Sequence, residues 1–230
     1  MPLLLEVIVS SIDDARAAEA GGAGRLEIVR DIGSGGLTPP VELVREIAAA
    51  TTLPLRVIVR ENAGYEMGVG ELDSLRRAAR EFAWLGVDGL VIGFAAEGEL
   101  RVDDVEQVLE AAPHVRATFH RAFDSLVDPL GAIDRLAAVP RIDRVLTGGG
   151  VGAAHLRATT LAQYQARAGS RLTIVAGSEV DETVASAIAQ VGCVTEIHVG
   201  RAARVGGQRD GAVSADRVRR LVATLDRGLR

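Results

Sequence analysis

Charged and imidazole side chains interrupt or end several apolar, strand-like runs of this sequence. Carboxylate and imidazole groups perform general acid–base chemistry, guanidinium groups hold anions, and imidazole also binds metal ions. A carboxylate within an apolar strand is costly to bury unless cations lie nearby. The pattern therefore predicts one polar site in which these groups converge. Its five members are Glu6, Glu27, Arg60, His120 and His198.

The segment TFHRAFD, residues 118–124, adds two charged groups just after His120. Arg121 and Asp124 follow the same strand-like run, so both are candidate site residues. We expect Asp124 to orient an imidazole, although its position also suits a cap for the next helix. Asp128 precedes a proline, which is typical of a helix N-cap, and capping is the role predicted for it.

Short runs rich in β-branched residues and Leu alternate with longer amphipathic segments along the whole chain. This alternation is typical of repeated βα units and a parallel sheet. Eight units of about 29 residues each predict a single (β/α)8 TIM barrel that occupies residues 1–230 as one domain. A doubly wound open sheet is the alternative, but the G-x-G-x-x-G of a dinucleotide site is absent, so no nucleotide cofactor is expected. The predicted strands are residues 3–9, 25–29, 55–59, 89–93, 116–120, 144–147, 173–176 and 196–199.

The barrel prediction places the polar residues at one end of the fold. Catalytic groups of such barrels come from the C-terminal strand ends and the loops that follow them. Glu27, Arg60, His120 and His198 all lie late in their predicted strands. Glu6 lies deeper in its strand, so a structural ion pair and a role in the site remain equally open for it.

Glycine-rich loops follow the last three predicted strands. Successive backbone N–H groups in such loops can bind an anion, and barrels often hold phosphate between the last two loops. The alternative is that glycine only permits tight turns. The segments 33–40 and 61–70 are predicted to form a rim over the pocket. The predicted anion-binding residues are Gly148, Gly149, Gly177, Ser178, Gly200 and Arg201.

Composition and charge narrow the range of partners. The chain is 48% hydrophobic and carries a net charge of −5 without a basic stripe, so neither nucleic acid nor a membrane is an expected partner. The N-terminal run lacks the basic start of a signal peptide, and one cysteine excludes internal disulfides, so we expect a cytoplasmic protein. Exposed helices of small barrels often associate, which makes a homo-oligomer one expectation.

Several motifs resemble those of the CutC family of copper homeostasis proteins. They are LE at residues 5–6, RLE at 25–27, GGLTP at 35–39, Arg60, TFHRAFD at 118–124, DRVLTGG at 143–149 and EIH at 196–198. The resemblance runs from the first predicted strand to the eighth. It implies a β/α barrel, a cytoplasmic location and copper as the bound ligand.

The sequence departs from this family at the residues on which its copper binding partly depends. Cysteines that follow the first two glutamates in the family are replaced here, beginning with Val7 and Ile28. The one cysteine, Cys193, is predicted to pack at the opposite barrel end. Met67, His120 and His198 remain as candidate copper ligands, although Cu(I) prefers thiolate and thioether.

Two functions of different classes follow from these observations. One is a CutC-family copper homeostasis protein, with His120 and His198 as metal ligands. The other is a cofactor-independent acid–base enzyme of isomerase or lyase type for a small anionic or phosphorylated metabolite. In the enzyme, His120 or His198 moves a proton with help from Glu27, while Arg60 and Arg121 hold the anion. A scaffold barrel without chemistry is a third alternative.

Overall fold

Eight parallel strands close into a barrel in the computed structural model, which describes residues 3–192 and 194–228. The strand order around the barrel is β1-β10-β9-β8-β7-β4-β3-β2, and β1 pairs with β10 to complete the ring. This closure confirms the predicted (β/α)8 barrel and excludes the open sheet. The strands are β1 (Leu4–Val9), β2 (Arg25–Ile28), β3 (Leu55–Ile58), β4 (Gly89–Ile92), β7 (Arg116–Phe119), β8 (Ile142–Thr147), β9 (Thr173–Ala176) and β10 (Glu196–Val199).

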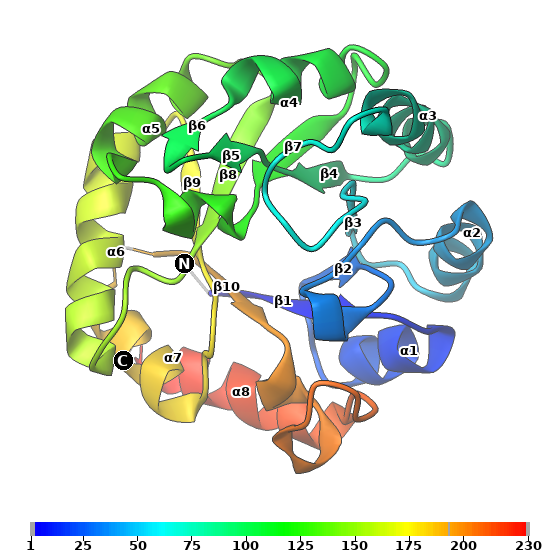
Figure 1. Cartoon of the computed structure of the whole chain (residues 1–230). Coiled ribbons are helices and arrows are strands. Elements are labelled where there is room, and N and C mark those ends of the chain that lie inside the picture. The colour runs from blue at the N-terminus through cyan, green and yellow to red at the C-terminus, as the bar shows by residue number, and fades with distance from the viewer. Residues whose placement is uncertain (1–2, 193, 229–230) are drawn as a thin grey trace.

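Helices form the outer ring around these strands, as Figure 1 shows in a view along the barrel. Each helix buries an apolar stripe against the strands, and Asp128 caps α5 by accepting a hydrogen bond from Gly131 N, as predicted. In the described ranges no helix is both long and apolar enough to cross a bilayer. The helices are α1 (Ile12–Ala20), α2 (Val41–Ala50), α3 (Glu71–Trp84), α4 (Val102–Leu109), α5 (Pro129–Ala137), α6 (Ala154–Ala168), α7 (Glu182–Val191) and α8 (Ala215–Gly228).

The loops after the strands contain short elements that were not predicted from the sequence. A hairpin of β5 (Ala95–Ala96) and β6 (Glu99–Leu100) follows β4. Its turn uses Glu97 and Gly98, both with positive φ, which matches a two-residue hairpin turn. The other additions are the 3-10 helices η1 (Ile32–Ser34), η2 (Arg121–Ser125), η3 (Arg201–Ala203) and η4 (Val205–Gly207).

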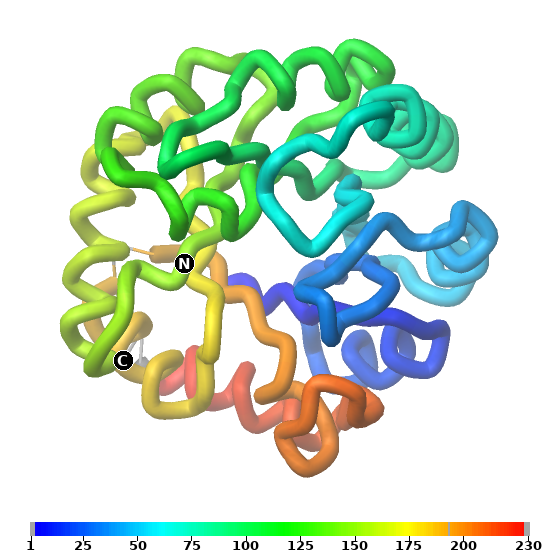
Figure 2. Tube along the Cα trace, viewed as in Figure 1, coloured from blue at the N-terminus to red at the C-terminus, as the bar shows by residue number. Residues whose placement is uncertain are grey.

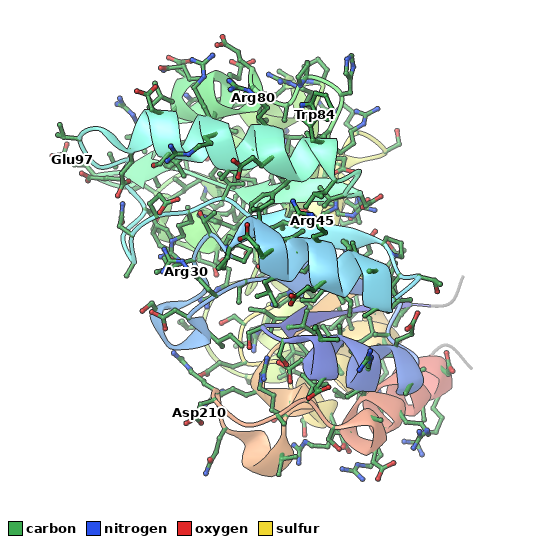
Figure 3. All side chains as sticks on the ribbon, turned by 90° about the vertical axis from the view of Figure 1, so that its right-hand side faces the viewer. Arg30, Arg45, Arg80, Trp84, Glu97 and Asp210 are labelled. Atoms are coloured by element: carbon green, nitrogen blue, oxygen red, sulfur yellow. The ribbon has the colours of Figure 1, made fainter. Side chains whose placement is uncertain are left out.

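The loops after β2, β3 and β10 surround the central opening at one end of the barrel (Figure 2). In the side view of Figure 3, Arg30, Glu97 and Asp210 lie on loops at this end. It is the end to which the C-terminal ends of the parallel strands lead. The fold therefore gathers the residues after each strand around one opening, as the sequence predicted.

The apolar core has two parts. The larger part lies between the strands and the helices and consists mainly of Val, Leu, Ile and Ala. A smaller cluster of Ile8, Val29, Ile58 and Val91 comes from four neighbouring strands, with side chains on the faces that alternate with the larger core. Polar groups share these inward faces, so the barrel interior is only partly apolar.

Candidate functional site

A cavity of about 930 Å³ opens at the C-terminal ends of the strands. Its lining includes Glu27, Arg60, His120, Arg121 and His198, which come from four strands and the loops after them. The structure thus brings together most of the residues that the sequence singled out. The rim segments predicted at residues 33–40 and 61–70 also contribute to the lining.

Two glutamates and a histidine form a buried cluster within the barrel. Glu6 and His198 are register partners on the adjacent strands β1 and β10, and His198 Nδ1 lies 2.9 Å from Glu6 Oε1 in a hydrogen bond. The same Nδ1 is 3.3 Å from Glu27 Oε2. Because Nδ1 carries one proton and it is directed to Glu6, Glu27 Oε2 is buried without a hydrogen bond.

The three groups of this cluster have displaced pKa values. Burial would raise the pKa of Glu6, but the Arg25 guanidinium and His198 outweigh it and hold that pKa well below its usual value. Burial raises the pKa of Glu27 to about 7, with the negative charge of Glu6 adding to the rise. Burial opposes protonation of His198, yet Glu27 and Glu6 together raise its pKa. The cluster therefore holds an exchangeable proton near neutral pH.

His120 follows β7 directly and differs from His198 in its hydrogen bonds and in the direction of its pKa shift. Its Nδ1 accepts a hydrogen bond of 3.1 Å from the backbone N–H of Ala122, and its Nε2 is buried without a partner. Burial, reinforced by the charge of Arg60, lowers the pKa of His120 to about 3. His120 is thus a neutral imidazole at pH 7. A proton-transfer role for His120 stays a prediction, and of the two histidines only His198 has a raised pKa.

Arg60 presents an uncompensated charge at the same pocket. Its guanidinium donates to backbone carbonyls of both rim loops, including Gly64 O at 3.3 Å and Gly35 O at 3.4 Å. It also lies over the ring of Tyr65, 5.2 Å from the centroid. Among the described residues, no carboxylate lies within ion-pair distance of Arg60. Arg121, which pairs with Asp124 at 3.0 Å, adds a second cation to the lining.

Asp124 does not orient an imidazole, which corrects the prediction. Its carboxylate accepts hydrogen bonds from Thr147 Oγ1 at 2.6 Å and from Gly148 N at 3.0 Å, while Gly149 N donates to Thr147 Oγ1. The backbone N–H groups predicted to bind an external anion at Gly148 and Gly149 therefore bind groups of the protein itself. Neither glycine lines the cavity.

The loops after β9 and β10 meet the cavity with some of their predicted residues. Ser178, Gly200 and Arg201 line it, whereas Gly177 N is committed to a backbone hydrogen bond with Thr147 O. Arg201 pairs with the exposed Glu179 at 2.9 Å. Such an exposed pair is weak and can yield to a ligand. Binding of an anion by these loops remains a prediction.

A buried ion-pair network below the cluster escaped the sequence analysis. Arg25 pairs with both Glu6 and Glu196, and Arg144 pairs with Glu196 at 2.8 Å. Arg56, which is also fully buried, makes a bidentate contact of 2.8 Å with Asp143 and so continues the network. The alternation of side chains along a strand could have revealed this network, because residues two apart on a strand point to the same face. Arg25 stands two residues before Glu27.

The same buried cluster is the one carboxylate and histidine group in the described residues that could hold a metal ion. One ligand atom each from Glu6, Glu27 and His198 lies within 4.8 Å of the others. His120 is not a member, so the pairing of the two histidines as metal ligands is not seen. Met67 packs against the apolar core, and Cys193 lies outside the described residues. Two carboxylates and an imidazole do not fit soft Cu(I), which prefers sulfur ligands.

Fold and site together define a (β/α)8 barrel with a polar pocket at its C-terminal strand ends. The CutC family model matches residues 3–203, so the chain belongs to the CutC family. A family protein CutC from Bacteroides fragilis strain YCH46 is 33% identical over 200 residues, which cover 85% of this chain and 78% of the relative. One from Xanthomonas campestris pv. campestris strain B100 is 31% identical, with 89% and 85% covered.

A solved structure supports the same fold. The CutC copper homeostasis protein of Streptococcus agalactiae superposes with a TM-score of 0.78 and 22% identity, covering 85% of this chain and 97% of that one. At this identity the likeness shows the barrel alone. Copper homeostasis is named for that protein only, and the chemistry of the present pocket depends on its own residues.

Proposed function

We propose that this protein is an acid–base enzyme without a redox cofactor that acts on a small anionic metabolite. The observation that carries the proposal is the cluster of Glu6, His198 and Glu27 at the floor of a pocket whose walls include Arg60 and Arg121. A buried carboxylate with a free oxygen beside an open cavity is suited to remove a proton from a bound molecule.

The three residues of the cluster take distinct roles in this proposal. Glu27 is the proton carrier, because its pKa of about 7 leaves both of its protonation states populated at neutral pH. His198 Nδ1 lies close to both Glu6 and Glu27, so a protonated imidazole compensates the charge that appears when Glu27 is deprotonated. Glu6 stays ionised through Arg25 and orients the imidazole.

The charge of the walls indicates an anionic substrate. Arg60 has no carboxylate partner in the described ranges, and Arg121 lies in the same lining. A positive potential in a concave site raises the local concentration of anions. Arg201 on the rim is the proposed contact for a phosphate group, since its present partner Glu179 is exposed. A small anionic or phosphorylated metabolite would give Arg60 an anionic partner and would compete with Asp124 for Arg121 and with Glu179 for Arg201.

Copper handling is the function that the family name suggests, and the residues do not support it. The candidate ligands are two carboxylate oxygens and one imidazole nitrogen, and the imidazole is already hydrogen-bonded to Glu6. Cu(I) selects thiolate and thioether ligands over such a set. We therefore derive no step through copper in this pocket.

The test is a solvent-exchange screen with a copper arm. Sugar phosphates and small carboxylic acids are incubated with the protein in D2O, and deuterium incorporation is followed by NMR. We expect incorporation into at least one compound with the wild type and none with Glu27→Gln. Thermal stabilisation by the same compound should be lost in Arg201→Ala if it carries phosphate.

Titration with Cu(I) under reducing conditions tests copper binding as the competing function. Stoichiometric high-affinity binding that is lost in both Glu27→Gln and His198→Gln, together with no exchange of any compound, would replace the enzyme proposal by copper binding. The exposed His114 supplies the control variant His114→Gln, which should change neither result.

A further inference from the structure

His120 Nε2 is a buried hydrogen-bond donor without a partner among the described residues, and it takes no part in the proton transfer by Glu27. The backbone N–H of Ala122 donates to Nδ1, so Nδ1 is an acceptor and the ring proton lies on Nε2. The residue is only 4% exposed, and Nε2 has no partner among the described residues. An unpaired buried donor costs about 1–3 kcal/mol, so its retention at a cavity wall indicates an acceptor supplied by a ligand.

The surroundings fix the ring in place. A Cβ at Gly93 would lie 2.7 Å from His120 Nδ1, so β4 passes directly behind the imidazole. The ring of Tyr65 lies on another side, with a centroid distance of 5.7 Å. Contacts on three sides therefore hold the imidazole in one orientation and fix the direction in which Nε2 points. They come from Ala122, Gly93 and Tyr65. Such rigid positioning is what a donor to a transient charge requires.

The charges around His120 favour negative charge on a bound ligand. Burial lowers the pKa of the imidazole, the charges of Arg60 and Arg121 lower it further, and both arginines line the cavity. A neutral imidazole can donate a hydrogen bond to an oxyanion without giving up its proton. Glu27 lies on β2 and His120 on β7, and β3 and β4 separate them in the barrel. A small molecule in the cavity can therefore lie between a proton acceptor and an oxyanion donor.

We infer that His120 is a catalytic residue that donates from Nε2 to a carbonyl oxygen, and that the substrate is a small anionic carbonyl compound with a hydrogen on the adjacent carbon. The inference rests on the proposed role of Glu27. The carboxylate of Glu27 takes the proton, the C–H electron pair forms a carbon–carbon double bond, and the carbonyl π electrons move to the oxygen. Return of a proton from Glu27 to the same carbon re-forms the C–H bond, and the electron pair on oxygen re-forms the carbonyl group, which completes the exchange.

The experiment uses oxalate, a planar dianion that resembles an enolate of this class, as the probe. Its affinity is measured by calorimetry for the wild type, His120→Phe, His120→Gln and Glu27→Gln. The two His120 variants are a matched pair, because both lose the imidazole but only glutamine keeps an N–H donor in the side chain. Thermal melting of each variant confirms folding, and His114→Phe is the surface control.

We expect oxalate to bind the wild type, at least about tenfold weaker binding by His120→Phe, and partial recovery in His120→Gln. In protein labelled with 15N-histidine, oxalate should shift the Nε2–H resonance of His120 and leave that of His114 in place. Equal oxalate affinity in the wild type and His120→Phe, or no binding by the wild type, overturns the inference. Loss of exchange in Glu27→Gln would then still support the proposed function, so the two failures are distinguishable.

Discussion

The sharpest physical consequence of the site is that Glu27 makes the fold less stable as the pH rises. The residue is 3% exposed, and burial raises its pKa from the usual 4.5 to about 7. Between these two values the folded protein keeps a proton that the unfolded chain has lost, so the free energy of unfolding falls with rising pH. At about 1.4 kcal/mol per pH unit, the loss amounts to about 3 kcal/mol.

Replacing Glu27 by glutamine removes this titration and keeps the shape of the side chain. We expect the stability gained by Glu27→Gln to grow by about 3 kcal/mol from pH 4.5 to 7 and to stay constant above that. His198 contributes in the same direction, because its raised pKa stabilises the fold below 6.5 and that stabilisation is lost as the pH rises through the folded value. Glu27→Gln removes part of this loss as well.

Chemical denaturation of the wild type and the variant over this pH range measures the effect. Glu6→Gln is the matched control, because the lowered pKa of Glu6 gives stability that is present above 4.5 and lost as the pH falls. That variant should therefore be less stable than the wild type at neutral pH. A difference between Glu27→Gln and the wild type that does not change with pH would refute the reasoning.

Three further outcomes follow from the packing. Arg25→Met should destabilise the fold by about 3–5 kcal/mol in denaturation experiments, since it leaves the buried Glu6 without its arginine and Glu196 with Arg144 alone, and a loss below 1 kcal/mol would contradict the buried network. Gly93→Ala should displace the His120 ring and abolish oxalate binding in calorimetry, whereas unchanged affinity would show that the ring can adjust. Asp14→Asn should leave the Arg204 charge buried without its anion, so the loop after β10 should become sensitive to limited proteolysis; wild-type resistance would argue against this anchor.

Much of the barrel could be predicted because its strands and helices alternate with clear periods. Each predicted strand is present to within two residues, and the residues at the strand ends do converge on one pocket. The hairpin after β4 was missed because its strands are two residues long and carry no alternation. Pairs this short are set by their turn, here at Glu97 and Gly98, more than by a pattern of side chains.

The partners within the site could not be predicted from spacing. Glu6 and His198 are 192 residues apart in sequence, and only closure of the barrel between β1 and β10 brings them together. Proximity along the chain was a misleading guide for Asp124, which lies near His120 in sequence but bonds to the loop after β8. The opposite characters of the two histidines arise from burial and neighbouring charges, which a linear sequence does not show.

The most direct test of the account is the titration of Glu27 itself in the folded protein. Carbon-13 NMR of glutamate carboxyl groups, with Glu27→Gln to assign the signal, gives its pKa without any substrate. The account predicts a midpoint near 7 for Glu27 and an ionised Glu6 throughout the range in which the protein is folded. A midpoint for Glu27 at the usual value of 4.5 would show that the carboxylate is not held as a proton carrier, and the acid–base account would fail.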